Sequence, residues 1–473
     1  MLTLAIVAAY FAALLAISRL TARGADNATF YRANGRAPWY MVAFGMVGAS
    51  ISGVTFVSVP GMVLTSQMTY LQVCLGFIAG YAAVAFVLLP LYYRLGLTSI
   101  YAYLGQRLGR RSYATGAWFF LLSKLTGSAL KFYVVCMILQ DFVLERAGVP
   151  FAVTAAAMVM LIWLYTRRGG IATLVFTDSF QTLCLLAALV LIIAAVVADL
   201  GLTPAGAVAA VAHSDMSRIF VFGDWASPHH FLKQFVSGAF IVVVMTGLDQ
   251  DMMQKNLTCR TLADAQKDMC TYGVAFVPVN MLFLALGVLL TMAVGSGVAG
   301  DALLTTYVRG SQAASLFFVL GIVAASFSSA DSALTSLTTS YCIDLRRRPD
   351  DERLRKRVHA AMCVAFVACI IAFRQVGSTS LIDAIYTLVG YTYGPLLGLF
   401  AFGLFTRRQP ADRLVPYVCV ASPLLCYALS VAADRLWGYR FGYEMLMLNG
   451  ALTFFGLWAS VVARRLPQPQ RQA

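Results

Sequence analysis

Small hydroxylated side chains and one carboxylate crowd an otherwise apolar stretch between Gly321 and Ser340. The stretch reads GIVAASFSSADSALTSLTTS and is long enough to span a membrane. On a helix, positions three, four and seven apart line one face. That face carries Ala325, Ser328, Ser329 and Ser332. Polar groups at bilayer depth need partners, and a hard cation satisfies several oxygen atoms together. Small residues also pack helices closely, but the charge of Asp331 favours a functional site.

The composition predicts that these residues belong to a membrane protein with many spans. Of 473 residues, 60% are hydrophobic and 12% are charged, and the mean hydropathy is +0.77. These values separate the chain from ordinary soluble domains. Apolar runs of about twenty residues predict about thirteen transmembrane helices. The runs lie near residues 1–19, 38–64, 70–94, 114–143, 150–166, 176–199, 231–249, 270–295, 311–342, 357–376, 379–405, 413–433 and 443–463. The first run lacks a basic leader and a small-residue cleavage site, so we expect a retained helix.

The net charge of +14 is distributed as an orientation signal. Lys and Arg cluster after every second predicted span, and the largest cluster is DLRRRPDDERLRKR at 344–357. The intervening loops at 61–69 and 296–310 carry almost none. This alternation predicts a multi-pass protein of the plasma (inner) membrane with its N-terminus outside and its C-terminus in the cytoplasm. The same alternation predicts that the basic residues face the headgroups of the lipid bilayer and do not bind nucleic acid.

The sequence shows neither a cysteine framework nor a catalytic motif. The ten cysteines fall almost entirely inside predicted helices and lack CxxC spacing, as expected of small apolar packing residues. No HExxH, GxGxxG or GxSxG motif stands in a supporting helix or strand context. We therefore expect no enzyme activity, and no feature predicts an obligate protein partner.

Two membrane segments are interrupted by glycine and polar residues where a straight helix would run unbroken. They read FGMVGASISGVTFVSVPG at 44–61 and FVSGAFIVVVMTGLDQDMMQK at 235–255. Unwound backbone leaves carbonyls and amides free for an ion or a solute, so paired breaks point to a transporter. Five spans follow from each break, in 38–199 and 231–405, and an odd number makes the halves insert in opposite orientations as inverted repeats. The remaining regions are an N-terminal helix and loop (1–37), an outer loop (200–230) and two final helices with a tail (406–473).

With these breaks the chain resembles the sodium/solute symporters, which include sodium-coupled sugar, proline and sialic-acid transporters. The resemblance covers the whole chain and rests on five motifs in family order. They are GASISG with Pro60 and Gly61, GGIATLVFTDSFQ at 169–181, DQDMMQK at 249–255, AASFSSADSAL at 324–334 and YGPLLGLF at 393–400. The resemblance implies an all-α, leucine-transporter-like fold, in which two inverted repeats of five helices follow one extra helix and precede two more.

The resemblance also implies a sodium site built from oxygen atoms without formal charge. Its ligands would be the carbonyls of Gly48, Ile51 and Ala325 and the hydroxyls of Ser328 and Ser329. Some family members hold a second Na⁺, which would fall here on Asp178, Ser328 and Ser332. Asp331 stands where the sialic-acid branch carries a serine. Alternatively, Asp178 cross-links helices without an ion, so the number of coupling ions stays open.

The first broken segment indicates the class of solute by comparison with the branches of the family. The proline branch has an aspartate where this chain has Ser50, and the sugar branch has a histidine where it has Thr55. Both solutes are therefore disfavoured. Ser50, Ser52 and Thr55 instead resemble the hydroxyl pattern of the sialic-acid branch, which also uses a glutamine near the position of Gln72.

The sialic-acid branch meets the carboxylate of its substrate with an arginine in the third core helix. Here the candidates are Lys124 and Lys131, which lie seven residues apart and therefore on one helix face. A lysine within a span is costly unless it snorkels, meets an anion or pairs with a helix carboxylate such as Asp178. Thr387 and Tyr391 on the tenth core helix would complete the pocket, unless the aromatic ring only packs.

These features predict a sodium-driven symporter that imports a small organic solute by alternating access, an acid or acidic sugar in preference to a neutral one. Na⁺ is the expected coupling ion. A proton-coupled carrier of the same fold is the alternative, in which Asp178 or Asp331 would titrate. A transporter-like membrane sensor is a third alternative, although no appended signalling domain supports it. A channel would need a pore motif that the sequence does not show.

Overall fold

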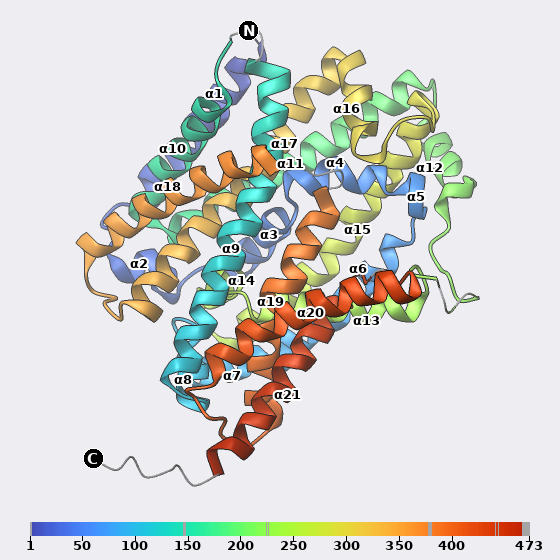
Figure 1. Ribbon diagram of the computed structural model, residues 1–473. Helices are drawn as coiled ribbons and strands as arrows, with labels where there is room; N and C mark the ends of the chain where they lie inside the picture. Colours follow the sequence, from blue (N-terminus) through green and yellow to red (C-terminus); the bar gives the residue numbers. More distant parts are fainter. Residues whose placement is uncertain are drawn as a thin grey trace.

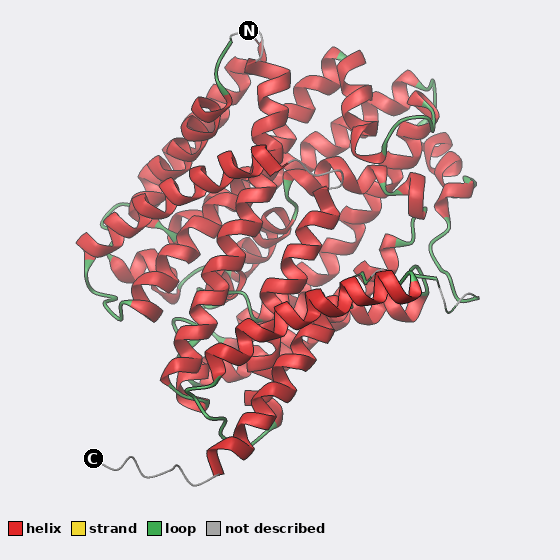
Figure 2. Cartoon of the chain, in the orientation of Figure 1, coloured by secondary structure: helices red, strands yellow, loops and turns green. Residues whose placement is uncertain are grey.

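The computed structural model describes residues 2–144, 148–223, 225, 227–376, 381–439, 441–442 and 444–465. Every regular element in these ranges is helical, apart from one isolated bridge between Ala37 and Cys259 (Figure 2). An apolar chain without water to satisfy its backbone folds as helices, because each helix pairs its own amides and carbonyls. The predicted all-α class is confirmed.

The helices follow one another along the chain as labelled in Figure 1. The first half contains α1 (Leu2–Thr21), α2 (Asn27–Arg32), α3 (Trp39–Ser50), α4 (Gly53–Gly61), α5 (Val63–Ser66), α6 (Tyr70–Ala83), α7 (Leu89–Arg94), α8 (Ala102–Arg107), α9 (Arg110–Leu139), α10 (Phe151–Gly169), α11 (Ile171–Asp199) and α12 (Pro204–Ala212). The second half contains α13 (Phe231–Val242), α14 (Gln250–Asn256), α15 (Leu262–Val294), α16 (Gly300–Gly310), α17 (Gln312–Ser340), α18 (Glu352–Val376), α19 (Leu381–Phe405), α20 (Val415–Trp437) and α21 (Met445–Arg465).

Each predicted apolar run contains a helix. In the part of the chain that the structure describes, nine helices are long and apolar enough to cross a membrane, and two bent pairs raise the number to eleven. The apolar stretches Ala5–Thr21 and Met445–Val461 are shorter. The number of helices that cross the bilayer therefore stays a prediction. The short helices α2, α8, α12 and α16 lie in segments where the sequence predicts only loops.

The first predicted break is confirmed as a bend of 63° between Trp39–Ser50 and Gly53–Ser66. Ile51 takes an extended conformation there, with φ −86° and ψ 103°, so α3 cannot continue. Ser52 then starts α4 with reciprocal hydrogen bonds. Its hydroxyl accepts from the Thr55 amide at 3.4 Å, and its own amide donates to the Thr55 hydroxyl at 3.3 Å.

The second predicted break is confirmed as a bend of 72° between Phe231–Gly247 and Gln250–Asn256. A π-helical turn, Val243–Gly247, ends the α13 arm. Asp249 then caps α14, because its carboxylate accepts hydrogen bonds from the amides of Asp251 and Met252. The bend thus places a carboxylate and a helix N-terminus inside the fold.

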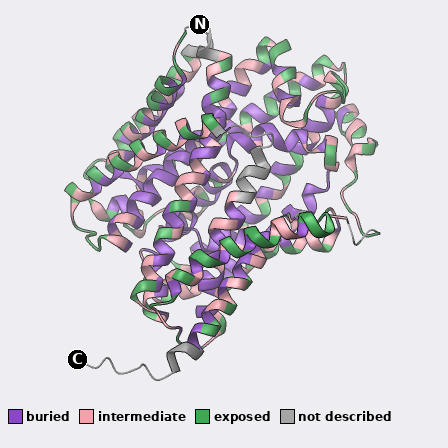
Figure 3. Ribbon diagram, viewed as in Figure 1, coloured by how far each residue is buried: buried purple, intermediate pink, exposed green. Residues whose placement is uncertain are grey.

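Close helix packing surrounds the two bent segments. Residues of α11 contact α17 and α3, and α13 lies along α6. The α6–α13 approach depends on glycine, because a Cβ at Gly238 would collide with the Val73 carbonyl and a Cβ at Gly76 would collide with the Phe235 carbonyl. Buried side chains fill the middle of the bundle, whereas α20 exposes apolar residues on the outside (Figure 3). An apolar outer face suits a lipid surrounding.

Candidate ion and solute site

The helical hydrogen bonds of α3 end at the first break. The Ile51 amide donates to the Gly48 carbonyl at 3.2 Å, and α3 makes no further turn beyond Ser50. The Ala49 carbonyl accepts a hydrogen bond of 2.9 Å from the Ser329 hydroxyl of α17. Gly48 lies against α11, where a Cβ would collide with a neighbouring side chain. The break thus offers the Ala49 carbonyl oxygen to α17.

The predicted hydroxyl face of α17 points toward two different helices. The Ser329 hydroxyl, besides reaching α3, lies 3.2 Å from the Ala325 carbonyl of its own helix. The Ser328 hydroxyl donates to Asp178 Oδ1 of α11 at 2.9 Å, and Ser332 Oγ lies 3.5 Å from Asp178 Oδ2. The structure therefore brings Ala325 and Ser329 to the broken helix, and Ser328 and Ser332 to the carboxylate. The assignment of all these groups as Na⁺ ligands stays a prediction.

Asp178 has an ion-pair partner that the sequence reasoning missed. The Nζ atom of Lys255 in α14 lies 2.7 Å from Asp178 Oδ2, and the two side chains are 3% and 1% exposed. Nearby, Asp331 Oδ2 accepts a hydrogen bond of 2.7 Å from the Tyr165 hydroxyl, while its Oδ1 has no partner among the described residues. The signal for Lys255 was present in the sequence, since DQDMMQK places a lysine inside a predicted broken span.

Lys124 is neutralised by two carboxylates at the second break. Its Nζ atom lies 2.7 Å from Asp251 and 3.2 Å from Asp249, and Asp249 also accepts a hydrogen bond of 2.6 Å from the Tyr393 hydroxyl. The alternative that a lysine of this helix pairs with a carboxylate of another helix thus holds for Lys124, with Asp249 and Asp251 in place of Asp178, because the bend before α14 brings these acids to α9. This cluster joins α9, α14 and α19.

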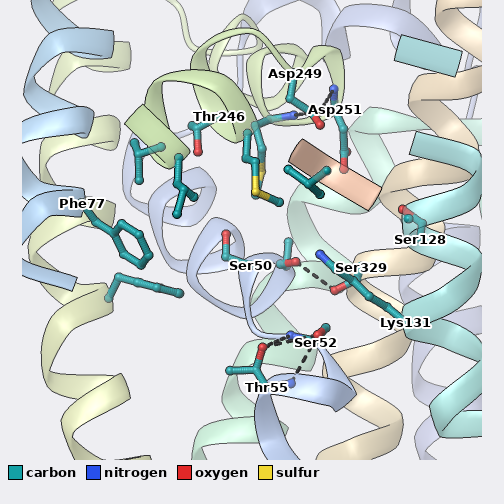
Figure 4. Close-up of a pocket in the computed structure, with 18 of the residues that line it drawn as sticks. Ser50, Ser52, Thr55, Phe77, Ser128, Lys131, Thr246, Asp249, Asp251 and Ser329 are labelled. Carbon is teal, nitrogen blue, oxygen red and sulfur yellow. Dashed lines mark hydrogen bonds between the residues drawn. The ribbon is translucent and has the colours of Figure 1, made fainter. Parts of the chain in front are cut away.

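Lys131 reaches from α9 into a cavity of about 160 Å³ at the centre of the bundle (Figure 4). The predicted residues Ser50, Ser52 and Thr55 line the same cavity, as does Ser329. Figure 4 shows Lys131 pointing toward Ser50 and Ser329. In the described ranges no carboxylate lies within ion-pairing distance of the Lys131 ammonium. Of the two lysines predicted to meet an anion, only Lys131 is left free to do so.

Beside the predicted Ser50, this cavity is lined by three hydroxyl side chains that sequence reasoning missed, those of Tyr81, Thr246 and Tyr272. We call Ser50, Tyr81, Thr246 and Tyr272 the hydroxyl wall. Ser50 Oγ lies 2.5 Å from the Tyr272 hydroxyl, which accepts a hydrogen bond of 2.7 Å from Tyr81. All four residues line the cavity. A tyrosine inside a span gives no sequence signal of its own, because aromatic side chains most often pack.

Two of the remaining predicted residues lie away from the cavity. Gln72 is fully buried at the start of α6, where its amide group donates to the His229 carbonyl at 3.0 Å and to Gln234 at 3.2 Å. These bonds fasten the long loop before α13, so the expectation that Gln72 lines the pocket is corrected. Tyr391 packs against a tyrosine ring of α20. The side chain of Thr387 lies outside the described residues.

Two broken helices that end beside a charged central cavity define a secondary transporter. The sequence model of the sodium:solute symporter family matches residues 30–412. The chain belongs to this family.

Known relatives agree with this assignment. The chain is 24% identical to the sodium/sialic acid symporter NanT of Aliivibrio fischeri over 94% of this chain and 91% of the relative. It is 23% identical to the sodium/sialic acid symporter SiaT of Proteus mirabilis over 88% and 87%. Among solved structures, a Na⁺-coupled sialic acid symporter in a substrate-bound outward-open state matches 99% of both chains, with a TM-score of 0.80 and 20% identity. The nucleobase-cation-symport transporter Mhp1 matches 92% and 94%, with a TM-score of 0.56 and 17% identity.

These comparisons confirm the predicted family and the leucine-transporter-like fold class. The protein is a membrane symporter coupled to Na⁺, and not an enzyme. Proton coupling and a sensor role are not favoured. The boundaries of the two repeats and the roles of single residues stay predictions.

Proposed function

We propose that the protein imports a small hydroxylated organic acid, an acidic sugar like sialic acid, together with Na⁺ by alternating access. The observation that carries this proposal is the ammonium of Lys131 in the cavity wall. Asp249 and Asp251, which line the same cavity, are already paired with Lys124. A charge held away from bulk water without a counter-ion is costly. A carboxylate on the solute supplies the missing counter-ion.

The hydroxyl wall supports a solute that carries hydroxyl groups as well. Each hydroxyl can both donate and accept a hydrogen bond, so the wall can exchange its internal bonds for bonds to a sugar. Sialic acid, the solute of the two bacterial sodium/sialic acid symporters, combines a carboxylate with several hydroxyls.

We place the coupling ion at the first break. Its ligands are the carbonyls of Gly48, Ile51 and Ala325 with the hydroxyls of Ser328 and Ser329. The hydrogen bond from Ser329 to the Ala49 carbonyl supports this assignment, because it brings oxygen atoms of α3 and α17 together without a carboxylate. Oxygen atoms are the ligands that hard cations prefer. Uncharged ligands also hold the ion weakly enough for it to leave during each cycle.

The cytoplasmic basic loops support an inner-membrane protein with its N-terminus outside and its C-terminus inside. The two bent segments open the proposed repeats 38–199 and 231–405 in equivalent positions. Rocking of one repeat against the other would expose the cavity to either side in turn. The partners of this cycle are the solute, Na⁺ and the bilayer.

Uptake into proteoliposomes tests the proposal. Labelled N-acetylneuraminate, two six-carbon uronates and their neutral parent sugars would be compared under an inward Na⁺ gradient at equal pH. We expect Na⁺-dependent accumulation of at least one acid and none of the neutral sugars, and replacement of Na⁺ by choline should abolish it. Accumulation of a neutral sugar alone would refute the acidic solute. Accumulation driven by a pH gradient without Na⁺ would refute sodium coupling.

A further inference from the structure

A second group of buried charges lies behind the proposed ion site and outside the solute cavity. It contains Asp178 of α11, Asp331 of α17 and Lys255 of α14, which are 1%, 0% and 3% exposed. The Lys255 Nζ atom lies 2.7 Å from Asp178 Oδ2. Apart from this ion pair, Nζ has no hydrogen-bond partner in the part of the chain that the structure describes. The ammonium is thus held by one carboxylate alone.

The Asp178 carboxylate, which pairs with Lys255, also contacts the hydroxyl groups of two serines, and together these oxygen atoms could bind a cation. Ser328 donates to Asp178 Oδ1 at 2.9 Å, and Ser332 Oγ lies 3.5 Å from Oδ2. One carboxylate and two hydroxyl oxygen atoms are the kind of ligand set that a small hard cation takes. In this chain the Lys255 ammonium already lies against that carboxylate, so the position has a positive charge before any ion arrives.

We propose that Lys255 is a tethered cation that fills this position, so that the protein binds one Na⁺ and not two. The inference rests on the proposed Na⁺ site at the first break. A second Na⁺ on Asp178 would lie about 4 Å from the ammonium, where repulsion weakens its binding about a thousandfold at the effective dielectric constant of protein sites. The ammonium also competes at a high effective concentration, because the chain tethers it beside the carboxylate.

Binding of ²²Na⁺ to the purified full-length protein measures the number of ions without any solute. We expect one ion per wild-type chain and two per Lys255→Met chain, because methionine keeps most of the side-chain volume and removes the charge. Lys255→Arg is the matched control, since it keeps a cation against Asp178 and should bind one ion. Two ions on the wild-type protein, or no gain in the methionine variant, would overturn the proposal.

A second variant keeps the test decisive if Lys255→Met does not fold, because that change leaves the Asp178 charge buried alone. Lys255→Met with Asp178→Asn removes both charges and should bind as many ions as the wild-type protein. Loss of one ion in this double variant would show that Asp178 already binds Na⁺ beside Lys255, and the proposal would fall.

Ser329→Ala tests the other site, the proposed Na⁺ site at the first break, by itself. Its hydroxyl hydrogen-bonds to the Ala49 and Ala325 carbonyls and, among the described residues, not to Asp178, so an unchanged ion count there refutes the proposed function and not the role of Lys255.

Discussion

Replacement of Lys131 by glutamine tests the acidic solute most directly. The variant keeps a polar side chain of similar length and removes the charge that faces the cavity. Loss of one member of a desolvated charge pair costs about 2–5 kcal/mol. Lys131 is only partly buried, so we expect about 2–3 kcal/mol, the lower end of that range. Each 1.4 kcal/mol is tenfold, and the KM for the acid should therefore rise by about 30- to 150-fold.

The assay is initial uptake of a labelled acid into proteoliposomes at saturating Na⁺, with kcat and KM determined separately. Lys131→Arg should retain much of the affinity, since its guanidinium can still bind a carboxylate. Lys124→Gln is the matched control, because the same substitution seven residues earlier removes a lysine that is paired within the protein. Lys124→Gln should lower the thermal stability of the protein, since it leaves the carboxylates of Asp249 and Asp251 without the lysine that neutralises them. An unchanged KM in Lys131→Gln would refute the carboxylate contact and leave a neutral solute on the hydroxyl wall.

Two further predictions concern the ion and the packing. Ser328→Ala combined with Ser329→Ala removes two of the about five proposed Na⁺ ligands, so uptake should collapse while the protein still reaches the membrane, and undiminished Na⁺-dependent uptake would contradict the site. Gly238→Val places a side chain against the Val73 carbonyl and should destabilise the α6–α13 contact by about 1–3 kcal/mol, as overpacking does. A melting temperature equal to that of the wild-type protein would show that the two helices can separate without cost.

The sequence was informative about the fold because membrane helices are specified locally. Apolar length predicts a helix wherever water is absent, and each predicted run contains one. The breaks were equally visible, since Gly48 and Gly53 interrupt one apolar pattern and Gly247 and Asp249 end another. The short helices α2, α8, α12 and α16 were missed, because they are too short for the length criterion.

The site was less predictable, because a side chain's partner depends on how distant helices meet. The hydroxyl face of α17 follows from helical spacing within one segment. Helical spacing does not show which of Lys124 and Lys131 is free to bind an anion, since both lie on one face of α9. The difference arises because the bend before α14 brings Asp249 and Asp251 to Lys124. The prediction that Gln72 lines the solute pocket was wrong for the same reason, because the long loop before α13 lies over Gln72 and takes up its hydrogen bonds.

Two fixed positive charges, on Lys131 and Lys255, lie close to the oxygen atoms proposed to hold Na⁺. Of these two, only Lys255 has a counter-ion among the residues that the structure describes. Lys255 is neutralised by Asp178 at 2.7 Å. Lys131 lines a cavity wall together with Ser329, so that Na⁺ at the proposed site and the ammonium repel each other while the cavity lacks an anion. A carboxylate between them lowers the electrostatic cost of both. The acid then raises the affinity for Na⁺, and by reciprocity Na⁺ raises the affinity for the acid by the same factor. A neutral sugar would leave the repulsion in place, so the position of one unpaired lysine favours coupled transport of Na⁺ with an anion.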